Sequence, residues 1–213
     1  MTNYLTDKLT YTDDGRLLMS NGYAVMMDWE DGIMKESAKI VCENGGKILN
    51  IGFGMGIIDT YIETHPIKEH WIIEAHPDVL VYMKKTGWYD KPNVHIVEGR
   101  WQDVLYTLPT FDGIYFDTWS DPYFYELLVP NLRNMLNNSG IFSFWGHIDD
   151  ENYINEKKRF SDMGMDVNYT DIVLPEIPNK EKQGILYWNP EITNYRVIRI
   201  QDNKKPQKPK TLI

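Results

Sequence analysis

The sequence predicts an α/β fold in which a mostly parallel, seven-stranded sheet carries helices on both faces. Short apolar runs alternate with longer amphipathic segments, which is typical of strand–helix–strand units in a doubly wound sheet. The first run, residues 47–51, ends in a glycine-rich turn, and two later runs end in an acid, Glu74 and Asp117. Because ligands bind beyond the carboxyl ends of parallel strands, these features predict one ligand site at one edge of the sheet.

Length and composition predict one soluble domain. The chain has 213 residues, of which 42% are hydrophobic and 25% charged, within the usual range for a single globular core. We expect this domain over residues 1–203, with residues 1–24 as a lead-in segment over the ligand cleft. Residues 204–213 are expected to form a basic, disordered tail. Whether the protein is a monomer or a homodimer is left open.

Charge and hydropathy limit the possible partners. The formal net charge of −9 argues against a nucleic-acid-binding surface and favours a cationic substrate. The first ten residues lack the apolar region of a signal peptide, and no run of about 18 apolar residues could span a membrane. The single cysteine, Cys42, excludes an intrachain disulfide. We therefore expect a cytoplasmic protein without a metal site.

Each element is predicted from its local pattern. A helix is expected over residues 25–46, with Asp28 as its N-cap and Gly45 at its stop. A second helix is expected over residues 123–138, with a kink at Pro130. The other predicted elements are strands over residues 47–51, 71–74, 94–99, 111–117, 141–146, 166–175 and 193–200, and helices over residues 57–64 and 151–164.

The glycine turn indicates which cofactor binds. Gly52, Gly54 and Gly56 fit the pattern G-x-G-x-G of methyltransferases, whereas the dinucleotide pattern needs a glycine at the position of Ile57. The spacing therefore favours S-adenosylmethionine over NAD. Glu74 lies 22 residues after Gly52, near the spacing of about 20 at which an acidic side chain binds ribose hydroxyls.

Four loops should converge on one crevice. They are the glycine turn, the segment after Glu74, residues 99–102 and the segment after Asp117. Met55 and Trp101 could supply apolar and stacking surface for an adenine, although core packing explains either residue taken singly.

Two acids stand apart from Glu74 as candidates for chemistry. Asp117 closes an apolar strand, where a carboxylate is costly to bury unless it is paired or functional; a helix cap is the alternative. Glu30 shares a helical face with Met34, and with Met26 if the helix begins early, whereas a solvated first-turn glutamate is the alternative. His147 could line the same mouth or be a surface histidine.

Two carboxylates beside a methyl sulfonium suit a guanidinium acceptor. Carboxylates bind this planar cation through paired hydrogen bonds and fix one nitrogen in line with the methyl group. A guanidinium has a pKa near 13 and a carboxylate near 4, so complete deprotonation before attack would cost roughly 12 kcal/mol in water. We therefore expect positioning first and proton acceptance late.

Several segments resemble one family, the guanidino N-methyltransferases. It comprises guanidinoacetate N-methyltransferase and the type IV protein arginine N-methyltransferases, which modify the internal δ nitrogen of arginine. The resemblance runs from about Tyr4 to Arg199 and is nearer the type IV branch, through NYLTDKLTYTDD, EAHPDV and the late YW. The segments that carry it are VMMDWE from Val25, NIGFGMGI from Asn50, EHWIIEAHPDV from Glu69, GRWQDV from Gly99 and FDGIYFDT from Phe111.

The resemblance implies a Rossmann-like class I S-adenosylmethionine-dependent methyltransferase with a defined set of site residues. Glu30 and Asp117 would be catalytic and hold the guanidino group, while Trp145 and His147 would contact the far end of the substrate. The chain departs from the family at Asn50, where many methyltransferases have an acid, and FWGHIDD resembles neither branch. The implied cofactor-binding residues are Tyr4, Met26, Met34, Gly52, Phe53, Gly54, Met55, Gly56, Ile57, Ile58, Glu74, Ala75, His76, Trp101, Gln102 and Asp117.

The expected function is S-adenosylmethionine-dependent methylation of a guanidino nitrogen, with the δ nitrogen of a protein arginine as the leading acceptor. A small-molecule acceptor, guanidinoacetate or free arginine, is the near alternative. A catalytically silent binding module and an NAD-dependent oxidoreductase are alternatives of other classes. Ile57 and the paired acids count against both of these.

Overall fold

The computed structural model describes residues 4–118, 123–147, 150–173 and 194–202. The predicted basic tail, residues 204–213, lies outside the described residues.

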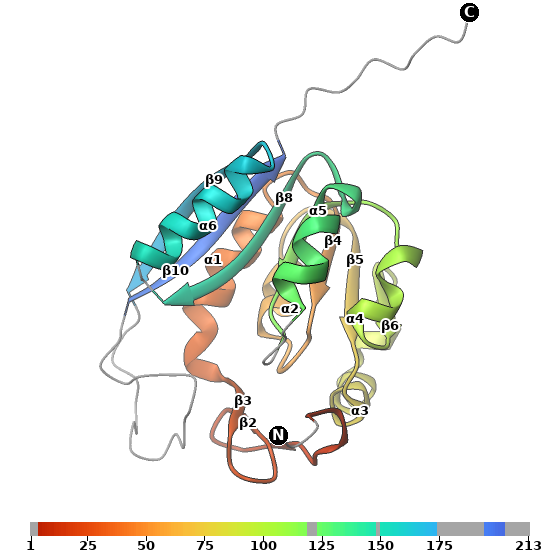
Figure 1. Cartoon of the computed structure of the whole chain (residues 1–213). Coiled ribbons are helices and arrows are strands. Elements are labelled where there is room, and N and C mark those ends of the chain that lie inside the picture. The colour runs from red at the N-terminus through yellow and green to blue at the C-terminus, as the bar shows by residue number, and fades with distance from the viewer. Residues whose placement is uncertain (1–3, 119–122, 148–149, 174–193, 203–213) are drawn as a thin grey trace, which may run out of the picture.

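The described residues form one main sheet of seven strands in the order β6-β5-β4-β7-β8-β10-β9 (Figure 1). The pairs β4–β5, β4–β7, β5–β6 and β7–β8 are parallel, and β10 runs antiparallel to both β8 and β9. The predicted sheet of seven mostly parallel strands is therefore confirmed. The strands are β4 (Gly46–Ile51), β5 (Ile67–Glu74), β6 (Val94–Glu98), β7 (Phe111–Phe116), β8 (Leu136–His147), β9 (Met165–Val173) and β10 (Asn194–Asp202).

Helices cover both faces of this sheet because consecutive strand side chains point to opposite sides. Ile48 and Leu49 of β4, both fully buried, belong to two different hydrophobic clusters. The first cluster includes side chains of α1, α2 and α3, and the second includes those of α4, α5 and α6; Figure 1 shows α1 and α6 on opposite faces. The helices are α1 (Asp31–Val41), α2 (Ile57–Ile62), α3 (Pro77–Lys85), η3 (Trp88–Asp90), α4 (Trp101–Val104), η4 (Leu105–Thr107), the π-helix η5 (Phe124–Leu128), α5 (Val129–Met135) and α6 (Asp150–Asp162).

The amino-terminal residues form a small antiparallel sheet of their own, in the order β1-β2-β3. It lies beyond the carboxyl ends of the parallel strands (Figure 1). The Tyr11 hydroxyl donates to the Gly54 carbonyl over 2.8 Å, and Lys8 Nζ lies 2.7 Å from Asp78 Oδ1 in α3. The lead-in segment is therefore attached to the glycine turn and to α3. The elements up to residue 30 are η1 (Tyr4–Thr6), β1 (Thr10–Tyr11), β2 (Arg16–Leu18), β3 (Ala24–Met27) and η2 (Asp28–Glu30).

The predicted helix over residues 25–46 is wrong at its start. In β3 the backbone is extended, because it pairs with β2 and Met26 lies opposite Leu17. The α-helix begins only at Asp31, after the 3₁₀ turn η2, so Asp28 is not its N-cap. Pairing with β2 outweighs the helical spacing of the apolar residues, as tertiary context commonly does.

The predicted helix over residues 123–138 is also wrong at its end. It stops at Met135, and Leu136 pairs with Phe111 of β7 as the first residue of β8. The π-helix η5 continues without a break into α5, which begins at Val129, and Pro130 is the second residue of α5. The kink expected at Pro130 stays a prediction.

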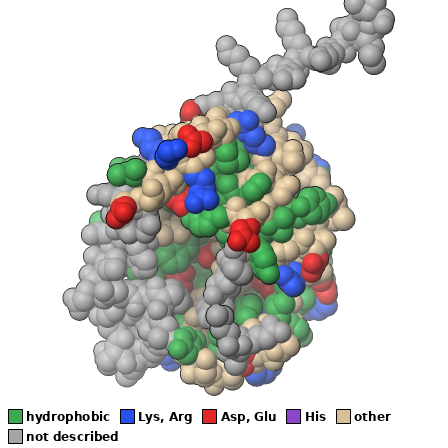
Figure 2. Space-filling model, in the orientation of Figure 1, with side chains coloured by type: hydrophobic (Ala, Val, Ile, Leu, Met, Phe, Trp, Pro, Cys, Tyr) green, Lys and Arg blue, Asp and Glu red, His purple; other side chains and the backbone are tan. Residues whose placement is uncertain are grey.

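The surface in Figure 2 carries hydrophobic side chains near its centre, while Lys and Arg side chains lie in small separate groups. On this face, the distribution differs from the continuous basic stripe that nucleic-acid-binding surfaces carry. Among the residues that the structure describes, no helix combines the length and hydropathy needed to cross a membrane. The cytoplasmic location stays a prediction.

Candidate active site

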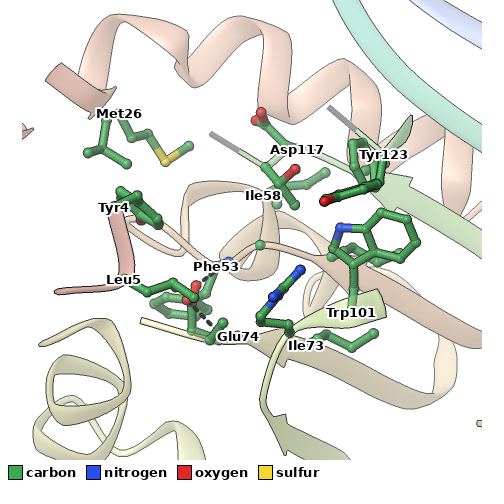
Figure 3. Close-up of a pocket in the computed structure, with 18 of the residues that line it drawn as sticks. Tyr4, Leu5, Met26, Phe53, Ile58, Ile73, Glu74, Trp101, Asp117 and Tyr123 are labelled. Atoms are coloured by element: carbon green, nitrogen blue, oxygen red, sulfur yellow. Dashed lines mark hydrogen bonds between the residues drawn. The ribbon is translucent and has the colours of Figure 1, made fainter. Parts of the chain in front are cut away.

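A cavity of about 780 Å³ lies beyond the carboxyl ends of the parallel strands. Its wall is built by the amino-terminal residues up to Glu30, the glycine turn, the segments that follow β5, β6 and β7, and the last part of β8. Figure 3 shows Tyr4 and Met26 on one side of this cavity and Trp101 and Tyr123 on the other. The predicted convergence of distant loops on one crevice is therefore what the fold produces.

The glycines of the turn are required by the packing of the chain itself. Gly52, Gly54 and Gly56 have φ angles of 97°, 55° and 73°, which residues with a Cβ rarely adopt. A Cβ on Gly52 would collide with the backbone carbonyl of Asp117, and one on Gly54 would lie 2.7 Å from Met26 Sδ. The turn thus packs closely against Asp117, just after β7, and against Met26 of β3. Only residues without a Cβ allow this close packing.

Glu74 is held by three backbone N–H groups at the end of β5. Its Oε1 accepts hydrogen bonds from Ala75 (2.7 Å) and His76 (2.6 Å), and its Oε2 accepts one from Phe53 (3.0 Å). Burial raises the pKa of this carboxyl group, and the three N–H donors oppose that rise. The carboxylate lines the cavity in a fixed orientation, as an acceptor of ligand hydroxyl groups should.

Two further acids line the same cavity from different elements. Glu30 of η2 is only 3% exposed, and its Oε1 accepts the Met27 N–H over 2.8 Å. The alternative of a solvated first-turn glutamate is therefore wrong. Asp117 directly follows β7, and its Oδ2 accepts the Trp145 indole N–H over 3.2 Å. Burial raises the pKa of Asp117 to about 6, although the indole donor lowers it.

A buried polar network lies beneath the glycine turn. Asn50 Nδ2 donates to the Gly52 carbonyl and to the carboxylate of Asp59, with all distances at 2.9 Å. His70 joins Asp59 to Glu63, with Nε2 3.0 Å from Asp59 Oδ1 and Nδ1 2.9 Å from Glu63 Oε1. Burial opposes protonation, but the two carboxylates leave the His70 pKa above its ordinary value. At the position where many methyltransferases have an acid, this chain therefore has the amide of Asn50, which donates to the carboxylate of Asp59.

Most of the predicted site residues meet at the cavity, although their roles there stay predictions. Met26 does not share a helical face with Glu30, since Met26 is in β3 and Glu30 is the N-cap of α1. The predicted residues that line the cavity are Tyr4, Met26, Glu30, Gly52, Phe53, Gly54, Ile58, Glu74, Ala75, Trp101, Gln102, Asp117 and Trp145.

Other predicted residues lie elsewhere. Met34 is fully buried, and its Sδ accepts the Tyr115 hydroxyl over 3.6 Å. His76 faces the lead-in segment, with Nε2 3.0 Å from the Tyr4 carbonyl oxygen. His147 ends β8, but its side chain is outside the described part of the chain. The residues that do not line the cavity are Met34, Met55, Gly56, Ile57 and His76.

Sequence reasoning missed several wall residues, among them Leu5, Tyr23 and Tyr123. Arg100 also lines the wall, within the segment 99–102 that was expected at the crevice. Tyr23 and Tyr123 lie just before β3 and η5. No periodic pattern marks such positions.

The strand order, the parallel core and the cavity beside the glycine turn define a class I methyltransferase fold. The precorrin-6y C5,15-methyltransferase of Geobacter metallireducens matches 83% of this chain and 90% of its own, with a TM-score of 0.60 and 13% identity. The spermidine synthase of Thermotoga maritima matches 91% of this chain and 68% of its own, with a TM-score of 0.63 and 15% identity. At such identities the likeness shows the fold alone.

A family model described as guanidinoacetate N-methyltransferase matches residues 4–167, and the chain belongs to this guanidino N-methyltransferase family. The relative named protein arginine N-methyltransferase 2 in Yarrowia lipolytica is 46% identical over 159 residues, which cover 67% of this chain and 33% of that protein. Its namesake in Aspergillus oryzae is 39% identical over 212 residues, which cover 92% and 50%. The chain thus spans at most half the length of these two relatives. The predicted family is confirmed.

Proposed function

We propose that this chain transfers the methyl group of S-adenosylmethionine to a guanidino nitrogen of a protein arginine. The observation that carries the proposal is the pair Glu30 and Asp117, which line one cavity with the glycine turn and Glu74. Two carboxylates bind a guanidinium through charge-assisted hydrogen bonds and hold it in one orientation. The name shared by the two relatives supports arginine as the acceptor.

The residues at the cavity fit S-adenosylmethionine. The volume of about 780 Å³ lies within the range of 300–1,000 Å³ that is usual for ligand sites. Glu74 would accept the ribose hydroxyls, and the buried Trp101 would pack against the adenine. When bound, the sulfonium supplies an electrophilic methyl group. The turn itself would bring backbone close to the amino-acid part of the cofactor.

Glu30 and Asp117 would orient the acceptor before they take up a proton. With the Asp117 pKa raised to about 6 and a guanidinium pKa near 13, removing the proton beforehand would still cost roughly 10 kcal/mol. The carboxylates therefore hold the cation until the new carbon–nitrogen bond forms, which lowers the nitrogen pKa and lets a carboxylate accept the proton.

We further propose the δ nitrogen as the methylated atom, which the resemblance to the type IV branch supports. The second candidate acceptor is a small guanidine, guanidinoacetate or free arginine. It is favoured by the description of the family model, guanidinoacetate N-methyltransferase.

An acceptor screen tests these proposals. The purified chain is incubated with isotopically labelled S-adenosylmethionine and, separately, with arginine-containing peptides, guanidinoacetate or free arginine, and products are identified by mass spectrometry. Labelled peptide with the label on the δ nitrogen is expected. Label on a small guanidine alone would support the second candidate. No label anywhere, with calorimetric binding of S-adenosylhomocysteine intact, would support a silent binding module.

Substitutions test the assignment of the two acids. Asp117→Asn and Glu30→Gln should each lower kcat/KM by at least about 100-fold, because each removes a charge that the buried cation needs. Asp31→Asn is the matched control, since Asp31 is exposed and outside the cavity wall. Turnover near wild type in either cavity variant would show that the assignment is wrong.

A further inference from the structure

We propose that Trp145 is the positioning residue for Asp117: its indole N–H holds one carboxylate oxygen and so fixes the orientation in which Asp117 meets the substrate cation. This inference rests on the proposed function. It replaces the expectation that Trp145 contacts the far end of the substrate. Trp145 comes from the segment that resembles neither branch of the family.

The first observation is the hydrogen bond itself. Trp145 Nε1 lies 3.2 Å from Asp117 Oδ2, and both residues line the cavity. An indole N–H donates and cannot accept, so it favours the charged form of the carboxylate. A carboxylate oxygen can accept two hydrogen bonds, so the indole can hold Oδ2 while the acceptor donates to either oxygen of Asp117. The geometry therefore favours one fixed orientation of the carboxylate toward the acceptor.

The second observation is that packing fixes the indole ring. Trp145 contacts Tyr195 of β10 edge-on, with ring centroids 5.5 Å apart, and Tyr195 is fully buried. Tyr195 also contacts Trp29, with ring centroids 5.5 Å apart. Trp29 directly precedes Glu30, so aromatic contacts connect the neighbour of one acid with the indole that binds the other. Such rings have few rotamers in a packed core, which makes Trp145 a rigid donor.

The hydrogen bond from the Trp145 indole is the side-chain hydrogen bond that affects the Asp117 pKa. Asp117 raises the pKa of the fully buried Tyr115 after the larger effect of burial. The Asp117 pKa itself responds first to burial and then to Trp145. The other charged and titratable side chains of the cavity wall are Glu30 from η2, Glu74 from β5, Arg100 before α4, and Tyr4, Tyr23 and Tyr123.

Trp145→Phe removes the donor and keeps an aromatic ring against Tyr195. Trp71→Phe is a matched control, because the Trp71 indole donates to Glu69 Oε2 over 2.9 Å outside the cavity wall. Aspartate carboxyl carbons labelled with ¹³C allow the Asp117 titration to be followed by NMR, with Asp117→Asn used for assignment. We expect the pKa of Asp117 to rise by at least about 0.5 unit in Trp145→Phe, since a donor to its charged form is lost. It should stay unchanged in Trp71→Phe.

An equal Asp117 pKa in wild type and Trp145→Phe would overturn the proposal. A wild-type measurement covers the case in which Trp145→Phe does not fold. One indole N–H resonance should titrate together with Asp117 and should stop titrating in Asp117→Asn. If no indole resonance follows Asp117, the proposal fails.

Methyl transfer gives a separate readout. With the best acceptor from the screen, Trp145→Phe should lower kcat by about 10-fold, with an unchanged KM for S-adenosylmethionine. Because the Asp117 pKa rises by about 0.5 unit, this loss should be about 1.5-fold larger at pH 6.5 than at pH 8.5. A uniform loss at all pH values would indicate a purely structural role and count against the proposal. If the wild type methylates no acceptor, the proposed function fails, while the NMR titrations still decide the role of Trp145.

Discussion

The backbone N–H of Phe53 donates to Glu74 Oε2 over 3.0 Å and so joins the glycine turn to the end of the neighbouring strand. Together with the N–H groups of Ala75 and His76, it fixes both oxygens of Glu74. The glycine turn and Glu74, the candidate acceptor of the ribose hydroxyls, are therefore linked, and a substitution in either should disturb the other.

Glu74→Gln should weaken binding of S-adenosylhomocysteine by at least about 10-fold. The amide has one acceptor oxygen, and its NH₂ group would face a backbone N–H that needs an acceptor. Isothermal titration calorimetry measures this. Glu98→Gln is the matched control, because Glu98 pairs with Glu74 in the β5–β6 register but is outside the cavity wall. Equal affinities of the wild type and Glu74→Gln would contradict the assignment.

Gly52→Ala should destabilise the fold by about 3 kcal/mol. Its positive φ costs about 1–2 kcal/mol with a Cβ, and the collision with the Asp117 carbonyl adds an overpacking cost of about 1–3 kcal/mol. Gly22→Ala separates the two effects, since Gly22 has a φ of 83° and no atom within 4 Å of an added Cβ. Urea unfolding should show a clearly smaller loss for Gly22→Ala. Equal losses would mean that the collision is relieved without cost.

Asp117→Asn should stabilise the folded protein at pH 8 although it lowers kcat/KM for methyl transfer by at least about 100-fold. The pKa of Asp117 rises from 3.8 to about 6 on folding, so the folded state binds more protons in this interval and stability falls as the pH rises. Removing the charge should therefore add up to about 3 kcal/mol at pH 8, and less as the pH approaches 4. Urea unfolding at pH 5 and pH 8 measures the difference. A gain in stability that is larger at pH 5 than at pH 8 would contradict a raised Asp117 pKa in the folded state.

His70→Gln should destabilise the protein most at acidic to neutral pH. The raised pKa of His70 means that its contribution is fully present below about pH 6.5 and is lost as the pH rises through the folded-state pKa. The expected result is a stability difference from wild type that decreases toward alkaline pH. His95→Gln is the control, since the His95 side chain is 43% exposed. A difference that does not vary with pH would contradict a charged His70.

The sequence could predict the parallel sheet because each strand is a local apolar run and each glycine marks a local backbone need. It could also predict Gly52, Glu74 and Asp117 as site residues, since a strand that ends in a parallel sheet delivers its last side chain to one known edge. Local pattern failed at Met26, because pairing between β2 and β3 joins segments that helical spacing treats as one. Met34, which the resemblance implied as a cofactor contact, is buried in the core and outside the cavity wall.

The glycine turn, the two acids and the family resemblance thus came from the sequence itself, because they depend on residue type and spacing along the chain. Tertiary structure alone decided that Trp145 of β8 donates to Asp117 after β7. It also decided that Asn50 donates to Asp59, which in turn contacts His70. Trp145 and Asp117 lie 28 residues apart, and only the pairing of their strands brings an indole donor to a carboxylate. No local pattern encodes such a contact, because hydrogen bonds between strands depend on register and packing.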